Sequence, residues 1–173
     1  YYQYFNWEAL EGYYADRYNS FMQLENAKGK NYESWAYSAG WNKSYTYCNH
    51  LIENTGLQTK MLFWQLYQND VTGYLYYGTN NWGEYDANNG GFADNTVTGA
   101  LTNFKLSYAN GFDIHGNGVL FYGMTQGNIF GTSYIGSLRV ELMRDGIEEY
   151  QMLKMLEELK GKDTAKTVVG KVS

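Results

Sequence analysis

The spacing of hydrophobic positions changes along the chain, and the N-terminal part predicts a strand followed by a helix. Residues 2–7 are short and rich in aromatic side chains, which favours a strand. From Glu8 to Lys28 the apolar positions recur every three or four residues, as on one face of an amphipathic helix, and Gly29 is expected to end it. The apolar face consists of Leu10, Tyr14, Tyr18, Phe21 and Leu24.

The same alternation continues through the middle of the chain. Residues 32–38 predict a second strand, and a Gly-, Asn- and Ser-containing stretch follows through Asn49. Residues 57–67 form a helical pattern that is too densely apolar for a helix facing water, so we expect it to be buried. Residues 71–77 include an unbroken run of large side chains, which is typical of a strand covered on both faces.

The C-terminal part is less regular at first and then strongly helical. Residues 78–117 are rich in Gly and Asn, with one short element expected at 104–108. A fourth strand is predicted at 118–122, a long helix at 136–160 and a loosely ordered tail at 163–173. Strands that alternate with helices predict an α/β fold of parallel β/α units. Four such units make half of an eight-stranded barrel, and the length of 173 residues suits one domain or part of a larger one.

Composition agrees with a folded chain and removes several classes of partner. The 173 residues include 20 Gly and no Pro, and 44% are hydrophobic and 18% aromatic, well above the level of disordered chains. A net charge of -5 offers no basic patch for nucleic acid. No apolar run approaches the roughly 18 residues of a membrane span. The lone Cys48 cannot form an internal disulfide.

Motifs for metals and nucleophiles are incomplete. Residues 86–97 partly imitate a calcium loop, but Gly90 and Val97 stand where two oxygen ligands belong, so a Gly/Asn turn is the preferred interpretation. His50 and His115 lie in no recognisable triad, and two His and one Cys at wide separations argue against zinc. We therefore expect neither a metal nor an organic cofactor.

Aromatic and amide side chains gather where the predicted strands end. In parallel β/α folds these strand ends build the ligand site, and sugars suit such side chains because C–H faces pack on rings while hydroxyls bind neutral donors and acceptors. The opposing interpretation is that each aromatic is merely packed in the core or lies on the surface. The residues are Tyr37 and Trp41 after the second strand and Tyr77, Asn80, Asn81 and Trp82 after the third.

Three longer blocks carry a family resemblance. They are residues 51–64, beginning Leu-Ile-Glu-Asn-Thr; residues 73–82, with Gly-Tyr-Leu-Tyr-Tyr and a following Asn-Trp; and residues 116–150, which include Ser-Leu-Arg-Val-Glu-Leu-Met-Arg-Asp-Gly-Ile-Glu-Glu-Tyr. Together they resemble the domain of unknown function 4091 and the related glycoside hydrolase family 123, over about residues 30–160. The chain departs from the family pattern at Lys60 (usually Arg), Asn117 (usually Asp) and Tyr77 (usually Trp), and it has Thr55, Gly123 and Gly136 where the family usually has Pro.

The resemblance implies the C-terminal half of a (β/α)₈ TIM-like barrel with β-N-acetylhexosaminidase chemistry, so residues 1–173 are expected to form a single partial domain. In that family the acetamido group of the substrate is the nucleophile, and an adjacent Asp-Glu pair orients it and protonates the leaving oxygen. This sequence contains no Asp-Glu dipeptide, so the chain is expected to begin after the pair and to hydrolyse nothing alone. Glu148-Glu149 and Glu157-Glu158 lie within the last predicted helix, where charges form solvated or ion-paired faces.

The predicted role of the chain is therefore to form one wall of the sugar-binding site of a glycoside hydrolase. The partners implied are an N-acetylated hexosamine glycan and the missing N-terminal half of the barrel, and an extracellular or cell-surface location is favoured. The predicted substrate-binding residues are Tyr37, Tyr77, Asn81 and Trp82, with Trp41 and Tyr4 as further candidates. Structural roles, tying the last helix to its neighbours, are predicted for Arg139, Arg144, Asp145 and Glu148.

Two alternatives stay open at this point. One is a non-catalytic carbohydrate-binding module that uses the same aromatic residues, and the other is a purely structural fragment whose aromatics are core. A half barrel also leaves strand edges unpaired, so we expect the isolated chain to be poorly soluble. The loops without the family's prolines are expected to be more mobile.

Overall fold

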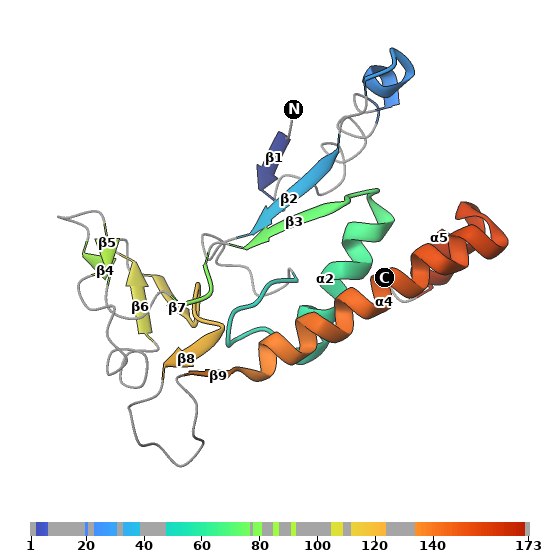
Figure 1. Cartoon of the computed structure of the whole chain (residues 1–173). Coiled ribbons are helices and arrows are strands. Elements are labelled where there is room, and N and C mark those ends of the chain that lie inside the picture. Colours follow the sequence, from blue (N-terminus) through green and yellow to red (C-terminus); the bar gives the residue numbers. More distant parts are fainter. Residues whose placement is uncertain are drawn as a thin grey trace. The chain divides into compact units, whose positions relative to one another are not determined.

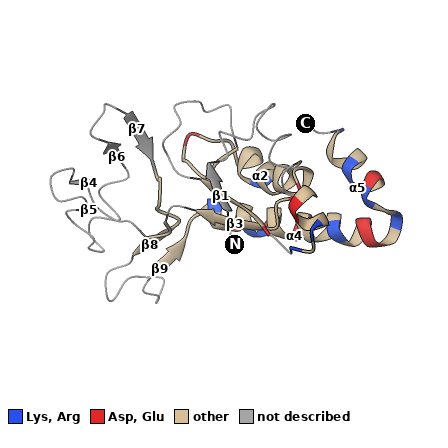
Figure 2. Cartoon of the chain, turned by 90° about the horizontal axis from the view of Figure 1, so that it is seen from above, with Lys and Arg blue, Asp and Glu red and all other residues tan. Residues whose placement is uncertain are grey.

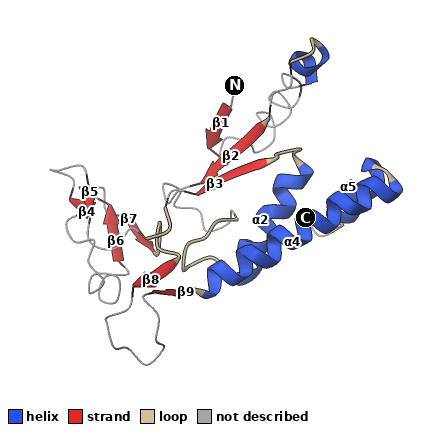
Figure 3. Cartoon of the chain, viewed as in Figure 1, coloured by secondary structure: helices blue, strands red, loops and turns tan. Residues whose placement is uncertain are grey.

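The computed structural model contains helices and short strands of mixed α/β type (Figures 1 and 3). It describes residues 3–6, 20, 23–30, 33–38, 48–76, 78–80, 85–86, 91–92, 105–108, 112–123 and 134–171. The elements are β1 (Gln3–Asn6), β2 (Ser34–Ser38), α2 (Gly56–Gln68), β3 (Gly73–Tyr76), β4 (Tyr85–Asp86), β5 (Gly91–Phe92), β6 (Lys105–Tyr108), β7 (Phe112–His115), β8 (Phe121–Gly123), β9 (Tyr134–Gly136), α4 (Leu138–Lys160) and α5 (Lys162–Val169).

These elements fall into two compact units. The first unit comprises residues 1–38, 60–75 and 144–173, and the second comprises residues 39–59 and 76–143. Helices α2 and α4 each contribute residues to both units. None of the helices in the described part of the chain is long and apolar enough to cross a membrane.

The first unit contains a small parallel sheet in the order β1-β2-β3. β1 runs parallel to β2 in a register that pairs Gln3 with Ser34 and Asn6 with Tyr37. The arrow of β3 points the same way as that of β2 in Figure 1, and the backbone N–H of Thr72 donates to the Ser34 carbonyl at 2.9 Å. The strands predicted at 2–7, 32–38 and 71–77 are thus confirmed, as is the helix predicted at 57–67 between the last two.

Apolar side chains of three helices form the core of the first unit. Tyr67 of α2, Leu153 of α4 and Ala165 and Val169 of α5 are buried together, with Trp64, Tyr150 and Leu156 packed against them. Asp70, just after α2, forms ion pairs with Lys162 and Lys166 at 2.7 and 2.8 Å. Residues 163–173 were expected to be a loose tail, but α5 occupies most of this range because its apolar face joins this core.

The strands of the second unit pair in antiparallel fashion, which the alternating pattern of strands and helices did not predict. β4 pairs with β5, β6 with β7 and β8 with β9. β6 confirms the element expected at 104–108, whereas the strand expected at 118–122 as a fourth parallel strand is instead β8 of a hairpin. Asp86 and Gly91, from the partial calcium-loop pattern, are partners in the β4–β5 ladder.

Helix α2 begins with a capping box. The Thr55 hydroxyl accepts from the backbone N–H of Gln58 at 3.2 Å, and the Gln58 side-chain oxygen accepts from the backbone N–H of Thr55 at 2.8 Å. Two N–H groups that helix geometry leaves without partners are thereby satisfied. Thr55 therefore fixes the start of α2 at a position where the resembling family usually has Pro.

Candidate functional site

The predicted sugar-binding residues lie mainly outside the described residues. This holds for Tyr77, Asn81, Trp82 and Trp41, and for the side chain of Tyr4, whose backbone lies in β1 opposite Trp35. Tyr37 is described and lies near the C-terminal end of β2, where it is half-buried.

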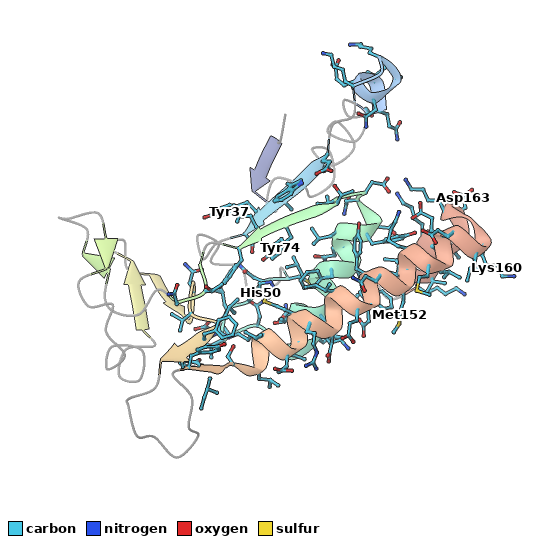
Figure 4. All side chains as sticks on the ribbon, in the orientation of Figure 1. Tyr37, His50, Tyr74, Met152, Lys160 and Asp163 are labelled. Atoms are coloured by element: carbon cyan, nitrogen blue, oxygen red, sulfur yellow. The ribbon has the colours of Figure 1, made fainter. Side chains whose placement is uncertain are left out.

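The two faces of β2 differ in burial, which identifies the side on which Tyr37 lies. Ser34, Ala36 and Ser38 are buried, and the residues between them are only half-buried. The Ser38 hydroxyl shares a hydrogen bond with the Tyr74 hydroxyl of β3, and the Tyr74 ring meets Phe63 of α2 edge to face at 5.8 Å. The α2 side of the sheet is therefore the Ser38 face, and Tyr37 points away from it (Figure 4).

The face that bears Tyr37 also carries Trp35. Gly73 of β3 lies beneath the Trp35 indole so closely that a Cβ there would overlap the ring. The Trp35 indole N–H donates to the Glu33 carboxylate at 3.1 Å. This face of the sheet thus presents two aromatic side chains, with a glycine making room for one of them.

In the second unit a buried arginine joins segments that are distant in the sequence. Arg139 is the second residue of α4 and is 8% exposed. Its guanidinium donates to the carbonyl oxygens of His50 at 2.6 Å and Gly116 at 2.7 Å, and also to the Val119 carbonyl and, at 3.4 Å, to the Tyr122 hydroxyl. The structural role predicted for Arg139 is confirmed by these bonds.

Next to this arginine, Tyr76 is held by the loop at residues 116–118. The Tyr76 hydroxyl accepts from the backbone N–H of Gly118 at 3.2 Å and lies 3.5 Å from the side-chain oxygen of Asn117, which is 1% exposed. The Tyr76 ring also meets the His50 imidazole edge to face, with ring centres 5.1 Å apart. Removal from water, with a smaller effect of Arg139, lowers the pKa of His50 to about 3. His50 is therefore a neutral packing residue at neutral pH.

The segment that follows Tyr76 is held by the same loop. The Thr79 carbonyl accepts from the backbone N–H groups of Leu120 at 2.8 Å and Phe121 at 3.0 Å. Asn80 forms an antiparallel bridge with Val119, whose carbonyl is one of the acceptors for Arg139. The backbone immediately before the predicted site residues Asn81 and Trp82 is thus fixed at Thr79 and Asn80.

Carboxylates of α4 take part in ion pairs, as predicted, and Figure 2 shows acidic and basic residues along this helix. Glu149 lies 2.6 Å from the Lys60 ammonium and accepts from the Trp64 indole N–H at 2.7 Å. The hydrogen bond to Glu149 holds the pKa of Lys60 above its usual value. Glu157 likewise accepts from the Tyr67 hydroxyl at 2.9 Å and from Lys154 at 2.8 Å.

Arg144, for which a structural role was also predicted, is paired with acidic residues of its own helix. It is exposed, and its ion pairs include those to Asp145 at 3.2 Å and Glu148 at 3.8 Å, both on α4. That it ties the last helix to its neighbours stays a prediction. Asp145 also acts at a distance on Lys60 of α2, whose pKa it helps to raise. Of these contacts the Arg144–Glu148 pair has the i,i+4 spacing that supports a helix locally, at a fraction of a kcal/mol.

Sequence reasoning gave no functional weight to His50 and Tyr76. A signal was nevertheless present, because the blocks that carried the family resemblance include Tyr76, Gly116 and Arg139 and begin next to His50. In the structure Arg139 binds the carbonyls of His50 and Gly116, and the N–H of Gly118 binds the Tyr76 hydroxyl. These segments thus form a packing centre in the second unit.

Comparison with known proteins supports the fold. A family 123 glycoside hydrolase from Clostridium perfringens, solved in a study of glycolipid glycan hydrolysis, is similar with a TM-score of 0.65 and 14% identity over 99% of this chain. The match covers 26% of that enzyme's chain. No protein-family model and no curated protein matches the sequence, so the link to the domain of unknown function 4091 stays a prediction. The chain thus has the fold of about a quarter of a family 123 glycoside hydrolase.

Proposed function

We propose that this chain is part of a glycoside hydrolase-like domain and contributes to the wall of its sugar-binding site. The observation that carries the proposal is the fold similarity to a family 123 glycoside hydrolase across nearly the whole chain. The match covers 26% of that enzyme, so the remaining strands of a barrel, with the Asp-Glu pair, would come from a part that this sequence does not contain. The substrate would be a glycan with an N-acetylated hexosamine.

The position of Tyr37 supports a sugar-binding wall. In a β/α barrel the helices cover the outside of the sheet, and ligands bind at the C-terminal ends of the strands. Tyr37 lies near the C-terminal end of β2, on the face away from α2. A ring at such a place offers a flat surface to the C–H face of a pyranose. Tyr77, Asn81, Trp82, Trp41 and Tyr4 complete the proposed wall.

Binding can be tested by titrating the protein with N-acetylgalactosamine and N-acetylglucosamine in a calorimeter or by NMR. Tyr37→Ala and Trp82→Ala should each weaken binding about tenfold, since loss of an aromatic contact costs roughly 1 kcal/mol. Tyr134→Ala is a matched control, because Tyr134 is 58% exposed and lies on β9, outside the proposed wall. Equal affinities in all three variants and the unaltered protein would remove these aromatics from the site.

An activity assay distinguishes the proposed role, as one wall of a site, from that of a domain that is an enzyme by itself. The chain contains no Asp-Glu dipeptide, and its paired glutamates on α4 include Glu149 and Glu157, which are engaged with Lys60, Trp64, Tyr67 and Lys154. We therefore expect no release of nitrophenol from an aryl N-acetylgalactosaminide by the chain alone. Hydrolysis at enzyme-like rates by the purified chain would contradict the proposal.

A further inference from the structure

Arg139 has acceptors that are unusual for a buried cation. Removing a guanidinium from water is costly unless strong acceptors replace the lost hydration. Among the described residues these acceptors include three backbone carbonyls, those of His50, Gly116 and Val119. A carbonyl that is held by a buried cation has its peptide plane fixed. The side chain of Arg139 therefore determines the course of two loops, not just the start of α4.

One of these loops holds the backbone after β3. Val119, whose carbonyl binds Arg139, forms the bridge with Asn80, and the next two N–H groups along the loop bind the Thr79 carbonyl at 2.8 and 3.0 Å. Main-chain hydrogen bonds thus connect the guanidinium-bound loop to Thr79 and Asn80. Movement of the Val119 carbonyl would consequently be transmitted to the residue that precedes Asn81.

The same loop also holds the residue that precedes Tyr77. Gly116 adopts a positive φ of 69°, and a Cβ at this residue would lie 2.7 Å from the Arg139 guanidinium. The loop can therefore approach Arg139 only because residue 116 is a glycine. Two residues later, the N–H of Gly118 binds the Tyr76 hydroxyl at 3.2 Å. Tyr76 and Asn80, the described neighbours of Tyr77 and Asn81, are thus both fixed by the loop that Arg139 holds.

We propose that Arg139 is a positioning residue for the sugar site: it fixes the loop at residues 116–121, which in turn sets the backbone at Tyr76 and Asn80. The inference rests on the proposed function, in which Tyr77, Asn81 and Trp82 bind sugar. It goes beyond that function by assigning the geometry of the site to a side chain that does not touch the substrate. The Tyr76 hydroxyl acts as a second, smaller anchor for the same segment.

The test uses the chain labelled with 5-fluorotryptophan and observed by fluorine NMR. Each of the five Trp residues contributes one fluorine resonance, and Trp82→Phe identifies the one that belongs to Trp82. Arg139→Lys keeps the charge but loses the planar fork that reaches several carbonyls at once. Tyr76→Phe removes one hydroxyl, and it keeps the proposal testable if Arg139→Lys does not fold. Arg144→Lys is the matched control, since Arg144 is exposed on the same helix.

We expect Arg139→Lys to shift or broaden the Trp82 resonance and to weaken N-acetylgalactosamine binding about tenfold. Tyr76→Phe should act in the same direction with a smaller change, and Arg144→Lys should alter neither readout. The Trp64 resonance should stay in place in all variants and show that the first unit is folded, and a Trp82 resonance away from its position in urea should show the same for the second unit. A mere loss of stability would not move the resonance of Trp82 in the folded state.

The two proposals can fail separately. If the Trp82 resonance is unchanged in folded Arg139→Lys and Tyr76→Phe, the positioning role is wrong, whatever the sugar affinity. If that resonance shifts in both variants but the unaltered protein binds neither sugar, the positioning of the segment is supported and the proposed function is wrong.

Discussion

His50 shows at the residue scale how burial decides chemistry. Its side chain is fully buried, and the Arg139 guanidinium binds its backbone carbonyl at 2.6 Å. Both features oppose a second positive charge at this place, and the pKa of His50 falls to about 3 from an ordinary value of 6.5. In the unfolded chain the imidazole regains its ordinary pKa. Folding is therefore linked to the release of a proton between these two pH values.

This linkage predicts a pH dependence of stability. Between pH 6.5 and about 3 the unfolded chain binds a proton at His50 that the folded chain does not, so the free energy of unfolding should fall as the pH is lowered. The slope is at most about 1.4 kcal/mol per pH unit for one group. Urea unfolding between pH 6.5 and 5, above the range of most carboxylates, measures it. His50→Gln should flatten the curve in that interval, and an unchanged slope would contradict the assignment.

A second residue-scale prediction concerns Thr55. Thr55→Ala removes the hydroxyl that accepts from the Gln58 N–H at 3.2 Å and should lower the free energy of unfolding by about 1 kcal/mol. Thr55→Ser retains the oxygen and is the matched control, with a change of less than about 0.5 kcal/mol expected. Thermal unfolding of the three proteins measures the difference. Equal losses in both variants would show that the methyl group, and not the cap, is responsible.

Residues in regular elements could be predicted from the sequence better than residues in loops. The sequence predicts Tyr37 near the end of its strand and Arg139 in a structural role within a helix, because the spacing of apolar residues that marks a strand or a helix is a local property. The burial of His50 depends on Arg139, 89 positions further along the chain, and no local pattern reports such a contact. Tyr76 is similar, since its hydroxyl partner Gly118 is 42 positions away.

At the scale of elements, the contact between α2 and α4 depends on a residue with no side chain. A Cβ on Gly146 of α4 would lie 2.5 Å from the Phe63 ring and 3.0 Å from the Lys60 carbonyl oxygen, both on α2. Phe63 is buried and the carbonyl belongs to the helix backbone, so neither can give way easily. Close packing of α4 against α2 therefore requires glycine at position 146.

Gly146→Ala tests this contact, because close packing and helix propensity predict opposite signs for the change in the free energy of unfolding. In an exposed helix Ala is better than Gly by about 1 kcal/mol, but overpacking a core costs typically 1–3 kcal/mol. We therefore expect a net loss of about 1 kcal/mol in the free energy of unfolding by urea. Gly170→Ala is the control, because its φ of -65° is helical and a Cβ there would meet nothing closer than 3.4 Å. A stabilising Gly146→Ala would contradict the close approach.

Among the elements, the parallel β/α part could be predicted and the antiparallel pairs could not. α2, β2 and β3 follow from a period of 3.6 or from short apolar runs. β4 to β7 are two to four residues long and lie in a Gly- and Asn-rich stretch, where pairing depends on the partner strand rather than on local pattern. The unbroken run of large side chains in β3 also predicted that the strand is covered on both faces, but Leu75 is 43% exposed.

At the scale of the whole molecule, the described part of the chain leaves apolar surface uncovered. Met152, Met155 and Leu159 of α4 are 63%, 60% and 75% exposed, and their spacing places them on one side of the helix. In the parallel sheet, β1 and β3 are the outer strands. Exposed apolar stripes and strand edges are places where proteins associate with other chains. Both features offer surfaces on which further strands or helices can pack.

This surface leads to the expectation that the isolated chain self-associates. Sedimentation velocity at increasing protein concentration should show a rising sedimentation coefficient, since a stripe of three large apolar side chains gains by burial, at about 25 cal/mol per Å². Met155→Glu with Leu159→Glu should shift the protein toward monomer. Lys160→Glu makes the same change in net charge at an exposed position of α4 outside the stripe and should leave association almost unchanged. A chain that stays monomeric at all concentrations, or a double variant that associates like the unaltered protein, would show that the α4 stripe is not the contact surface.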